Sequence, residues 1–330
     1  MQIALIRSIT DKPWRSPETY QLIEASLGER WPVHAIETRD PDVLHSFLAK
    51  LHAQHGQEFF VFNIAEYLDE AQKTGFLPGL LEAWGLPHLG SSAETVAIGL
   101  DKGRTKAVLE ANGIPTPAYF TAEKLGPALR DQAAAIGYPL IAKPISEGGH
   151  IGVSNDSVVY DDAALEKRVA RILNEFDQPA LAEAFVSGEG MREYSVGILE
   201  GETRLAVPME IDFEAMPLDV DILSFEAAQN DLERTKLIED DALRNQVIDL
   251  ASRTFAAVGA QDYSRVDLRA DAIDCYVLEI NVMPGLGPHS FLPELAEQLH
   301  GLAYKDLIQR LAENSIRRQT AEREAGPPRR

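Results

Sequence analysis

The sequence predicts a chain that is α/β at its start and α+β afterwards, because the order of strands and helices changes along its 330 residues. In the first ninety residues, short apolar strands at residues 3–6 and 59–64 are separated by amphipathic segments. Strand–helix alternation of this kind is typical of a parallel sheet covered by helices. Later, residues 194–200 and 203–211 flank Gly201 without an intervening helix, which predicts an antiparallel hairpin.

The remaining elements follow from apolar spacing and from the positions of Gly and Pro. Helices are expected at residues 101–112, 127–137, 162–176, 243–258 and 294–314, and strands at residues 138–143, 179–186, 263–268 and 276–282. Residues 213–240 are acidic and irregular, and we expect a long functional loop there. The polar segment 317–330 is expected to be disordered.

Charge and composition exclude several classes of protein. The formal net charge of −21 argues against nucleic acid and anionic membranes as partners. The sequence has no apolar run of the roughly 18 residues that span a membrane, and its first residues predict a strand rather than a signal peptide. Cys275 is the single cysteine, so no intramolecular disulfide is possible, and we expect a cytoplasmic protein. Its predicted strand favours a buried structural thiol over a nucleophile.

Two late strands carry polar residues on one face. Side chains alternate along a strand, so Arg265 shares a face with Asp267, and Glu279 shares a face with Asn281. If the strands pair, two carboxylates and an amide oxygen converge into a site suited to Mg²⁺ held together with phosphates. The alternative is a solvated sheet face with a salt bridge to Arg265.

A glycine-rich loop follows a strand that ends at Lys143. Gly148, Gly149 and Gly152 permit backbone N–H groups to approach phosphate oxygens, with charge from Lys143. An ordinary turn is the alternative. Lys102 comes earlier in the chain, and a plain surface lysine is the alternative to a phosphate contact.

Glu183 lies among apolar neighbours near the expected joint between two domains. A charge in such a setting is costly unless it has a partner. An adenine amino group and an arginine side chain are both open as that partner.

Six stretches together resemble the ATP-grasp superfamily, and within it the D-alanine–D-alanine ligases and their relatives. They read FVFNIAE at residues 60–66, LLEAWGLPHLGS at 80–91, LDK at 100–102, IAKP at 141–144, RVD at 265–267 and LEINVMPG at 278–285. Their order and spacing make the resemblance specific, and it covers nearly the whole chain.

The resemblance implies an ATP-grasp fold of three domains, with ATP between two α+β domains that follow an N-terminal parallel α/β domain. The expected boundaries are residues 1–92 for the N-terminal substrate-binding domain, 93–185 for the central domain and 186–316 for the C-terminal domain, which carries the metal and catalytic groups. The reaction implied is ligation of a carboxylate to an amine through an acyl phosphate, with release of ADP and phosphate. The family also suggests a homodimer.

By the same resemblance, each candidate residue takes a role in ATP binding or catalysis. ATP would contact Lys102, Lys143, Gly148 and Gly149 through its phosphates, Glu183, Ala184 and Val186 through adenine, and Glu193 through ribose. About two Mg²⁺ ions, with Mn²⁺ as a substitute, would be held by Asp267, Glu279 and Asn281. Arg265 and the Gly285 N–H would stabilise the oxyanion, and Ser290 would contact the carboxylate of an amino-acid acceptor.

Three departures from the family pattern fall on the side of the first substrate. The serine-bearing loop is replaced by Gly149 and His150, the aromatic lid by residues 223–229, and the early glycine-rich turn by residues 7–14. We therefore expect a ligase with altered specificity, with His150 shaping the substrate pocket; a plain loop histidine is the alternative. An authentic D-alanine–D-alanine ligase and an ATP-binding protein that has lost catalysis are the competing functions.

Overall fold

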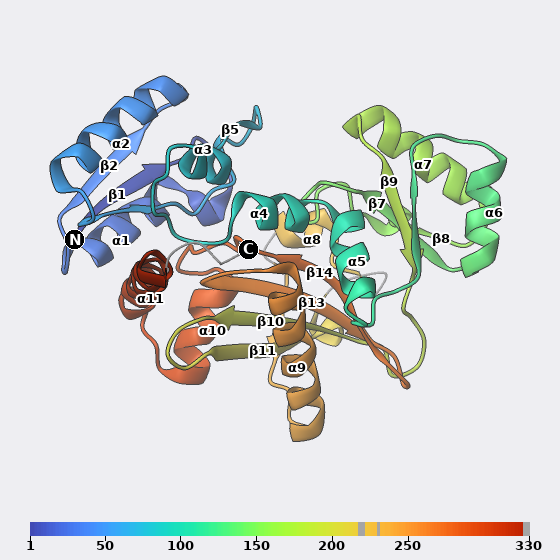
Figure 1. The fold of residues 1–330 in the computed structure, drawn as a ribbon. Coiled ribbons are helices and arrows are strands. Elements are labelled where there is room, and N and C mark those ends of the chain that lie inside the picture. Colours follow the sequence, from blue (N-terminus) through green and yellow to red (C-terminus); the bar gives the residue numbers. More distant parts are fainter. Residues whose placement is uncertain (217–221, 230–231, 326–330) are drawn as a thin grey trace.

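The computed structural model describes residues 1–216, 222–229 and 232–325. In these residues we distinguish three layers, each made of helices packed on a β-sheet (Figure 1). The N-terminal layer lies at the upper left of Figure 1, the central layer at the right and the C-terminal layer along the bottom. The expected domain boundaries remain a prediction.

The N-terminal sheet has the order β2-β1-β3, and both pairings are parallel, as the sequence predicts. Its elements are β1 (Gln2–Arg7), α1 (Pro17–Gly28), β2 (Val33–Glu37), α2 (Pro41–His55) and β3 (Phe59–Phe62), followed by the hairpin of β4 (Tyr67–Asp69) and β5 (Thr74–Phe76) and by α3 (Leu77–Ala83). Ser16 and Asp40 cap the N-termini of α1 and α2, which fixes where each helix begins.

The central sheet has the order β6-β9-β7-β8. Its strands are β6 (Tyr119–Ala122), β7 (Leu140–Pro144), β8 (Val158–Val159) and β9 (Ala180–Ala184), and its helices are α6 (Pro127–Ile136) and α7 (Asp162–Phe176). Two helices lead into it, α4 (Ala93–Leu100) and α5 (Lys102–Ala111). β7 is a central strand of this sheet, and the glycine-rich loop begins directly after it.

The C-terminal sheet is antiparallel, with the order β12-β11-β10-β13-β14. Its strands are β10 (Arg192–Leu199), β11 (Leu205–Ile211), β12 (Thr235–Lys236), β13 (Tyr263–Ala270) and β14 (Cys275–Asn281), and its helices are α8 (Phe225–Gln229), α9 (Asp241–Val258), α10 (Phe291–His300) and α11 (Tyr304–Ala325). The predicted hairpin of β10 and β11 is confirmed, as is the pairing of β13 with β14.

The expectation of a disordered segment from residue 317 is wrong as far as Ala325, because α11 continues to that residue. Arg318 Nε donates to Asp262 Oδ1 at 2.9 Å, and Gln319 Nε2 donates to the His88 carbonyl at 2.6 Å. These anchors hold a polar helix end against distant parts of the chain. Residues 326–330 lie outside the described residues.

The N-terminal sheet and the C-terminal helices share one apolar core. Ile3 and Phe60 belong to the same buried cluster as Leu292 and Leu307. The first residues of the chain are thereby fixed against the end of the C-terminal layer. Within the described chain, we find no helix long and apolar enough to cross a membrane.

Candidate active site

The polar faces of β13 and β14 meet as the alternation of side chains predicts. Arg265 pairs with Asn281 and Asp267 pairs with Glu279 in the antiparallel register. The Asn281 Nδ2 group donates to Asp267 Oδ2 at 3.2 Å. The three groups predicted to hold metal therefore lie together at the same end of the two strands.

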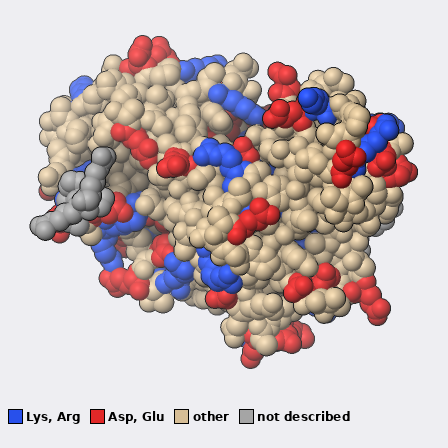
Figure 2. Space-filling model, turned by 45° about the vertical axis from the view of Figure 1, so that its right-hand side comes forward, with Lys and Arg blue, Asp and Glu red and all other residues tan. Residues whose placement is uncertain are grey.

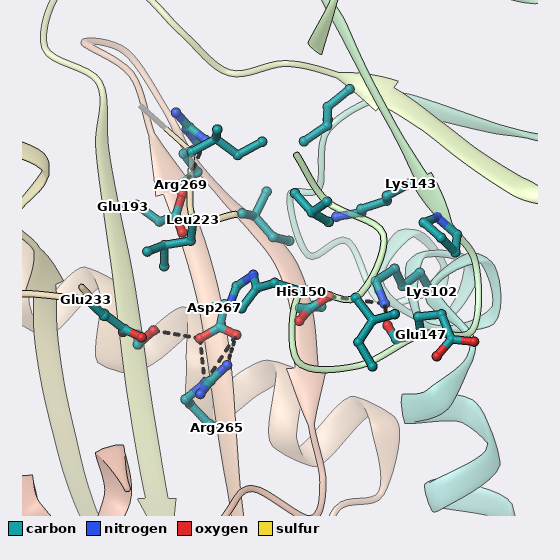
Figure 3. Close-up of a pocket in the computed structure, with 18 residues that line it drawn as sticks. Lys102, Lys143, Glu147, His150, Glu193, Leu223, Glu233, Arg265, Asp267 and Arg269 are labelled. Carbon is teal, nitrogen blue, oxygen red and sulfur yellow. Dashed lines mark hydrogen bonds and ion pairs between the residues drawn. The ribbon is translucent and has the colours of Figure 1, made fainter. Parts of the chain in front are cut away.

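Two further neighbours orient Asp267 (Figure 3). Arg265 donates to it from Nε at 2.9 Å and from Nη2 at 2.9 Å, which makes a bidentate ion pair. Ser195, opposite it on β10, donates from Oγ to Asp267 Oδ1 at 2.7 Å. The salt bridge named as the alternative is thus present, but Asp267 is buried and lines a cavity rather than a solvated sheet face.

The cavity lies between the C-terminal sheet and the central layer, and Figure 3 shows Lys102 and Lys143 on the opposite side of it from Asp267 and Arg269. The predicted residues that line it are Lys102, Lys143, His150, Glu193, Arg265, Asp267 and Glu279. The predicted residues outside its lining are Gly148, Gly149, Glu183, Ala184, Val186, Asn281, Gly285 and Ser290. Of these, Asn281 and Glu183 each contact a lining residue directly.

Lys102 joins the metal-site strands to the glycine loop. Its Nζ lies 3.5 Å from Glu279 Oε2 and donates to the Glu147 carbonyl. Burial opposes ionisation of Glu279, but Lys102 and Lys143 outweigh it, so the pKa of Glu279 lies below its usual range. Glu279 is therefore an anion at neutral pH, as a metal ligand must be.

Glu183 lies on β9 with 1% of its surface exposed, and its partners are two lysines. Lys143 Nζ lies 2.7 Å from Oε1, and Lys106 Nζ lies 2.5 Å from Oε2. The arginine alternative is therefore wrong, because lysines fill that place. Burial opposes ionisation of Glu183, but the two cations outweigh it and lower its pKa.

Lys106 was missed by sequence reasoning, although it is completely buried. It lies on α5 four residues after Lys102, so both lysines project from one face of the helix. That spacing is the signal that would have found it. Its Nζ also donates to Thr116 Oγ1 at 2.6 Å.

Arg269 and Glu193 form a second buried pair that extends the polar face of the sheet. They oppose each other on β13 and β10, with Arg269 Nη1 3.2 Å from Glu193 Oε2. Burial raises the pKa of Glu193 to about 7, although Arg269 acts in the opposite direction. Arg269 also stacks on Phe185, 4.5 Å from the ring centroid. The alternation of residues 265 and 267 continues to 269, so this residue was also within reach of the sequence.

The glycine loop folds back over the cavity. Gly149, His150 and Gly152 all have positive φ, at 61°, 59° and 77°. A β-carbon on Gly152 would lie 2.6 Å from Pro144, so glycine is required there. The Val153 carbonyl accepts a hydrogen bond from the Phe225 N–H at 3.0 Å, so the loop contacts the expected lid. Burial lowers the pKa of His150, which favours a neutral imidazole.

Gly285 and Ser290 lie in the turn between β14 and α10. The Ser290 N–H donates to the Gly287 carbonyl at 2.9 Å, and Ser290 precedes the first turn of α10. This turn, residues 283–290, is called the catalytic turn below. It borders the metal-site strands but does not line the cavity.

The donor set suits a metal ion held jointly with phosphate. Asp267, Glu279 and Asn281 offer oxygen atoms only, which matches the preference of Mg²⁺. Across the described residues, no group of three or more His, Cys, Asp or Glu side chains is arranged to hold a metal ion. A metal held by these two carboxylates and one amide would complete its coordination with phosphate oxygens or water.

The cavity gathers cations in a strongly acidic protein. Figure 2 shows acidic and basic side chains interspersed on one face of the molecule, without a continuous basic surface. The cavity is lined by four cations, Lys102, Lys143, Arg265 and Arg269, and by five carboxylates, Glu147, Glu193, Glu233, Asp267 and Glu279. The four cations offer the phosphates of a ligand a local attraction that the net charge of −21 does not, and the carboxylates offer oxygen atoms to a metal ion.

Comparisons with known proteins agree with this arrangement. The family described as D-ala D-ala ligase C-terminus matches residues 108–313. A D-alanine–D-alanine ligase of Chromohalobacter salexigens is 34% identical over 250 residues, covering 73% of each chain. One of Xanthomonas axonopodis pv. citri is 33% identical over 266 residues, covering 78% of each chain.

A solved structure shares the fold. The D-alanine–D-alanine ligase of Bacillus anthracis, in complex with ATP, superposes with a TM-score of 0.76 at 23% identity. The match covers 97% of this chain and 99% of that one. The ATP-grasp architecture expected from the sequence is thereby confirmed.

Proposed function

This chain belongs to the D-alanine–D-alanine ligase family and is an ATP-dependent ligase, and on that premise we propose that it joins a carboxylate other than D-alanine to an amine. The register of β13 and β14 carries the ligase chemistry of this proposal. It gathers Arg265, Asp267 and Glu279 opposite Lys102 and Lys143 in one cavity.

ATP is proposed to lie between the central sheet and the C-terminal sheet. Lys102 and Lys143 bind its phosphates, and Glu193 accepts from ribose. Glu183 is proposed to accept from the adenine amino group, which requires Lys106 or Lys143 to move aside, because these two lysines cover its oxygens. Ala184 and Val186 frame the base through their backbone. About two Mg²⁺ ions held by Asp267, Glu279 and Asn281 would neutralise charge on the transferring phosphoryl group, and Mn²⁺ is proposed as a substitute.

The reaction has two steps. An oxygen of the substrate carboxylate attacks the γ-phosphorus of ATP, the bond to ADP breaks, and an acyl phosphate forms. The amine then attacks the acyl carbon, loses a proton and expels inorganic phosphate. Arg265 stabilises charge on the acyl phosphate, and the Gly285 N–H donates to the oxyanion. Closure of the glycine loop and of the lid at residues 222–229 over the cavity keeps water from the acyl phosphate.

The substitutions that separate this chain from typical relatives support a carboxylate other than D-alanine. The glycine loop carries Gly149 and His150 where the family resemblance places serines. The α8 segment has Ala228 and Gln229 where that resemblance places a lysine and a tyrosine. The residues proposed to bind ATP and metal show no such change. We further propose that Ser290 contacts an amino-acid acceptor and that the enzyme acts as a homodimer.

The test is ADP release in a panel of carboxylates and amines with Mg²⁺, with products identified by mass spectrometry. We expect ADP and an amide product with at least one pair, and weak turnover with D-alanine alone. Efficient D-alanine-dependent release of phosphate would establish the second candidate, an authentic D-alanine–D-alanine ligase. That candidate is favoured by the names of the relatives in Chromohalobacter salexigens and Xanthomonas axonopodis.

A further inference from the structure

Trp14 reaches the catalytic turn from the far end of the chain. It lies in the short 3-10 helix Pro13–Arg15 between β1 and α1. A β-carbon placed on Gly285 would lie 2.7 Å from Trp14 Cβ and 2.8 Å from its Cγ. The tryptophan is therefore packed directly on the α-carbon of the residue that is proposed to donate to the oxyanion.

The other end of the same side chain reaches the glycine loop. A β-carbon on Gly149 would lie 3.3 Å from Trp14 Cη2. One indole thus spans from the catalytic turn to the loop that covers the cavity. A side chain in this place narrows the space between the two glycines.

Polar contacts of Arg15 and close packing of the tryptophan's own backbone fix the position of Trp14. The next residue, Arg15, is buried, donates from Nη2 to the Met283 carbonyl at 3.3 Å and forms ion pairs with Glu66 and Glu70. On the other side, a β-carbon on Gly287 would lie 3.2 Å from Trp14 Cα. The tryptophan is held against the catalytic turn by its backbone as well as by its ring.

The two ends of the cavity have different chemistry. The end near Lys143 is lined by Arg269 and Glu193, with Glu183 behind Lys143, and these groups are proposed to hold the nucleotide. The catalytic turn and Gly149 lie outside the cavity lining, and Trp14 packs on both from the N-terminal layer, so the carboxylate substrate is proposed to approach on the side of Trp14. The large, rigid and apolar indole ring of Trp14 excludes water and bulky substrate substituents from that side, and it offers little attraction to a charged substituent.

We infer that Trp14 is a specificity-determining residue, which limits the carboxylate substrate to one with a small substituent beside its carboxyl group. The inference rests on the proposed function and names the substrate class of the same site. Since a pocket distinguishes small differences in apolar size by roughly 10–200-fold, one wall residue is enough to set such a limit.

The test compares Trp14→Ala and Trp14→Phe with the wild-type enzyme on carboxylates of increasing side-chain size. Trp84→Ala is the matched control, because Trp84 packs against the core of the N-terminal layer and on His45, with ring centroids 4.7 Å apart. We expect Trp14→Ala to raise kcat/KM for bulky carboxylates by about tenfold or more relative to small ones. Trp14→Phe should give a ratio of kcat/KM values between those of the wild type and Trp14→Ala. The KM for ATP should not change in the Trp14 variants, and Trp84→Ala should show the same preference for carboxylate size as the wild type.

An equal loss of rate on every carboxylate in Trp14→Ala would overturn the inference, because it would mean a structural role only. If Trp14→Ala does not fold, Trp14→Phe decides by the same ratio. If the wild type releases no ADP with any pair, the proposed function fails instead. In that case the inference is tested by the rise in melting temperature that each carboxylate causes in the presence of Mg²⁺ and a non-hydrolysable ATP analogue. If the Trp14 variants rank the carboxylates by side-chain size in the same order as the wild type, the inference is overturned.

Discussion

Replacing Lys106 by methionine tests whether a buried lysine holds Glu183 in place. Methionine preserves an unbranched apolar stem and removes the ammonium group, which lies 2.5 Å from Glu183 Oε2. Breaking one side of a fully buried ion pair typically costs about 3–5 kcal/mol. Because Lys143 remains 2.7 Å from the other carboxylate oxygen, we expect a loss near the lower limit, about 3 kcal/mol. The KM for ATP should also rise, since Glu183 loses one of two groups that aim it.

Urea unfolding of Lys106→Met, Glu183→Gln and the double variant measures this cost and the coupling between the two residues. Lys50→Met, on the exposed face of α2, is the matched control and should leave stability within about 0.5 kcal/mol of the wild type. The reasoning is refuted if Lys106→Met loses less than about 1 kcal/mol, or if the two substitutions are additive.

Three further predictions concern single residues. Glu279→Gln should abolish Mg²⁺-dependent ADP release while leaving the circular dichroism spectrum unchanged; wild-type turnover would refute the metal assignment. Folding raises the pKa of Glu193 from its ordinary 4.5 to about 7. The protonated carboxyl group therefore contributes about 3 kcal/mol to the free energy of unfolding below pH 4.5. This contribution is lost as the pH rises from 4.5 through 7. Urea unfolding across that range should therefore show a steeper loss in the wild type than in Glu193→Gln, and equal slopes would contradict it. Burial raises the pKa of the Cys275 thiol to about 11, so Ellman's reagent should react with it only after unfolding; rapid reaction of the native protein would contradict a buried thiol.

The sequence predicts best those features that depend on local periodicity. The alternation along β13 and β14 was sufficient to place Arg265 and Asp267 on one face and to bring Glu279 beside them. Parallel pairing of the first strands followed from the order of strands and helices. In each case a short-range pattern determines which face of an element is buried.

Features that depend on distant partners were missed or wrong. Composition predicts disorder from residue 317 onward. Arg318 instead forms an ion pair with Asp262, and α11 continues to Ala325. Likewise, the sequence around Glu183 does not identify its partners, because Lys106 lies on α5 and Lys143 on β7, both distant from Glu183 in the chain. A sequence rich in polar residues predicts that the side chains at a helix end are exposed to solvent. Only the fold shows which of these side chains form ion pairs with distant residues.

The contact of Trp14 with Gly285 has the same character. The two residues are separated by most of the chain, and close approach is possible only because Gly285 lacks a side chain. The early segment at residues 7–14 was expected to differ from the family pattern, but its position over the catalytic turn was not predicted. The divergence of that segment is therefore a change in the wall of the proposed substrate site.

The path of oxygen from carboxylate to phosphate tests the central claim most directly. A carboxylate that supports ADP release is labelled with heavy oxygen in its carboxyl group, and the inorganic phosphate formed during ligation is analysed by mass spectrometry. Ligation through an acyl phosphate predicts that each phosphate carries one labelled oxygen from the carboxylate. Unlabelled phosphate, with both labelled oxygens elsewhere, would contradict the acyl-phosphate mechanism.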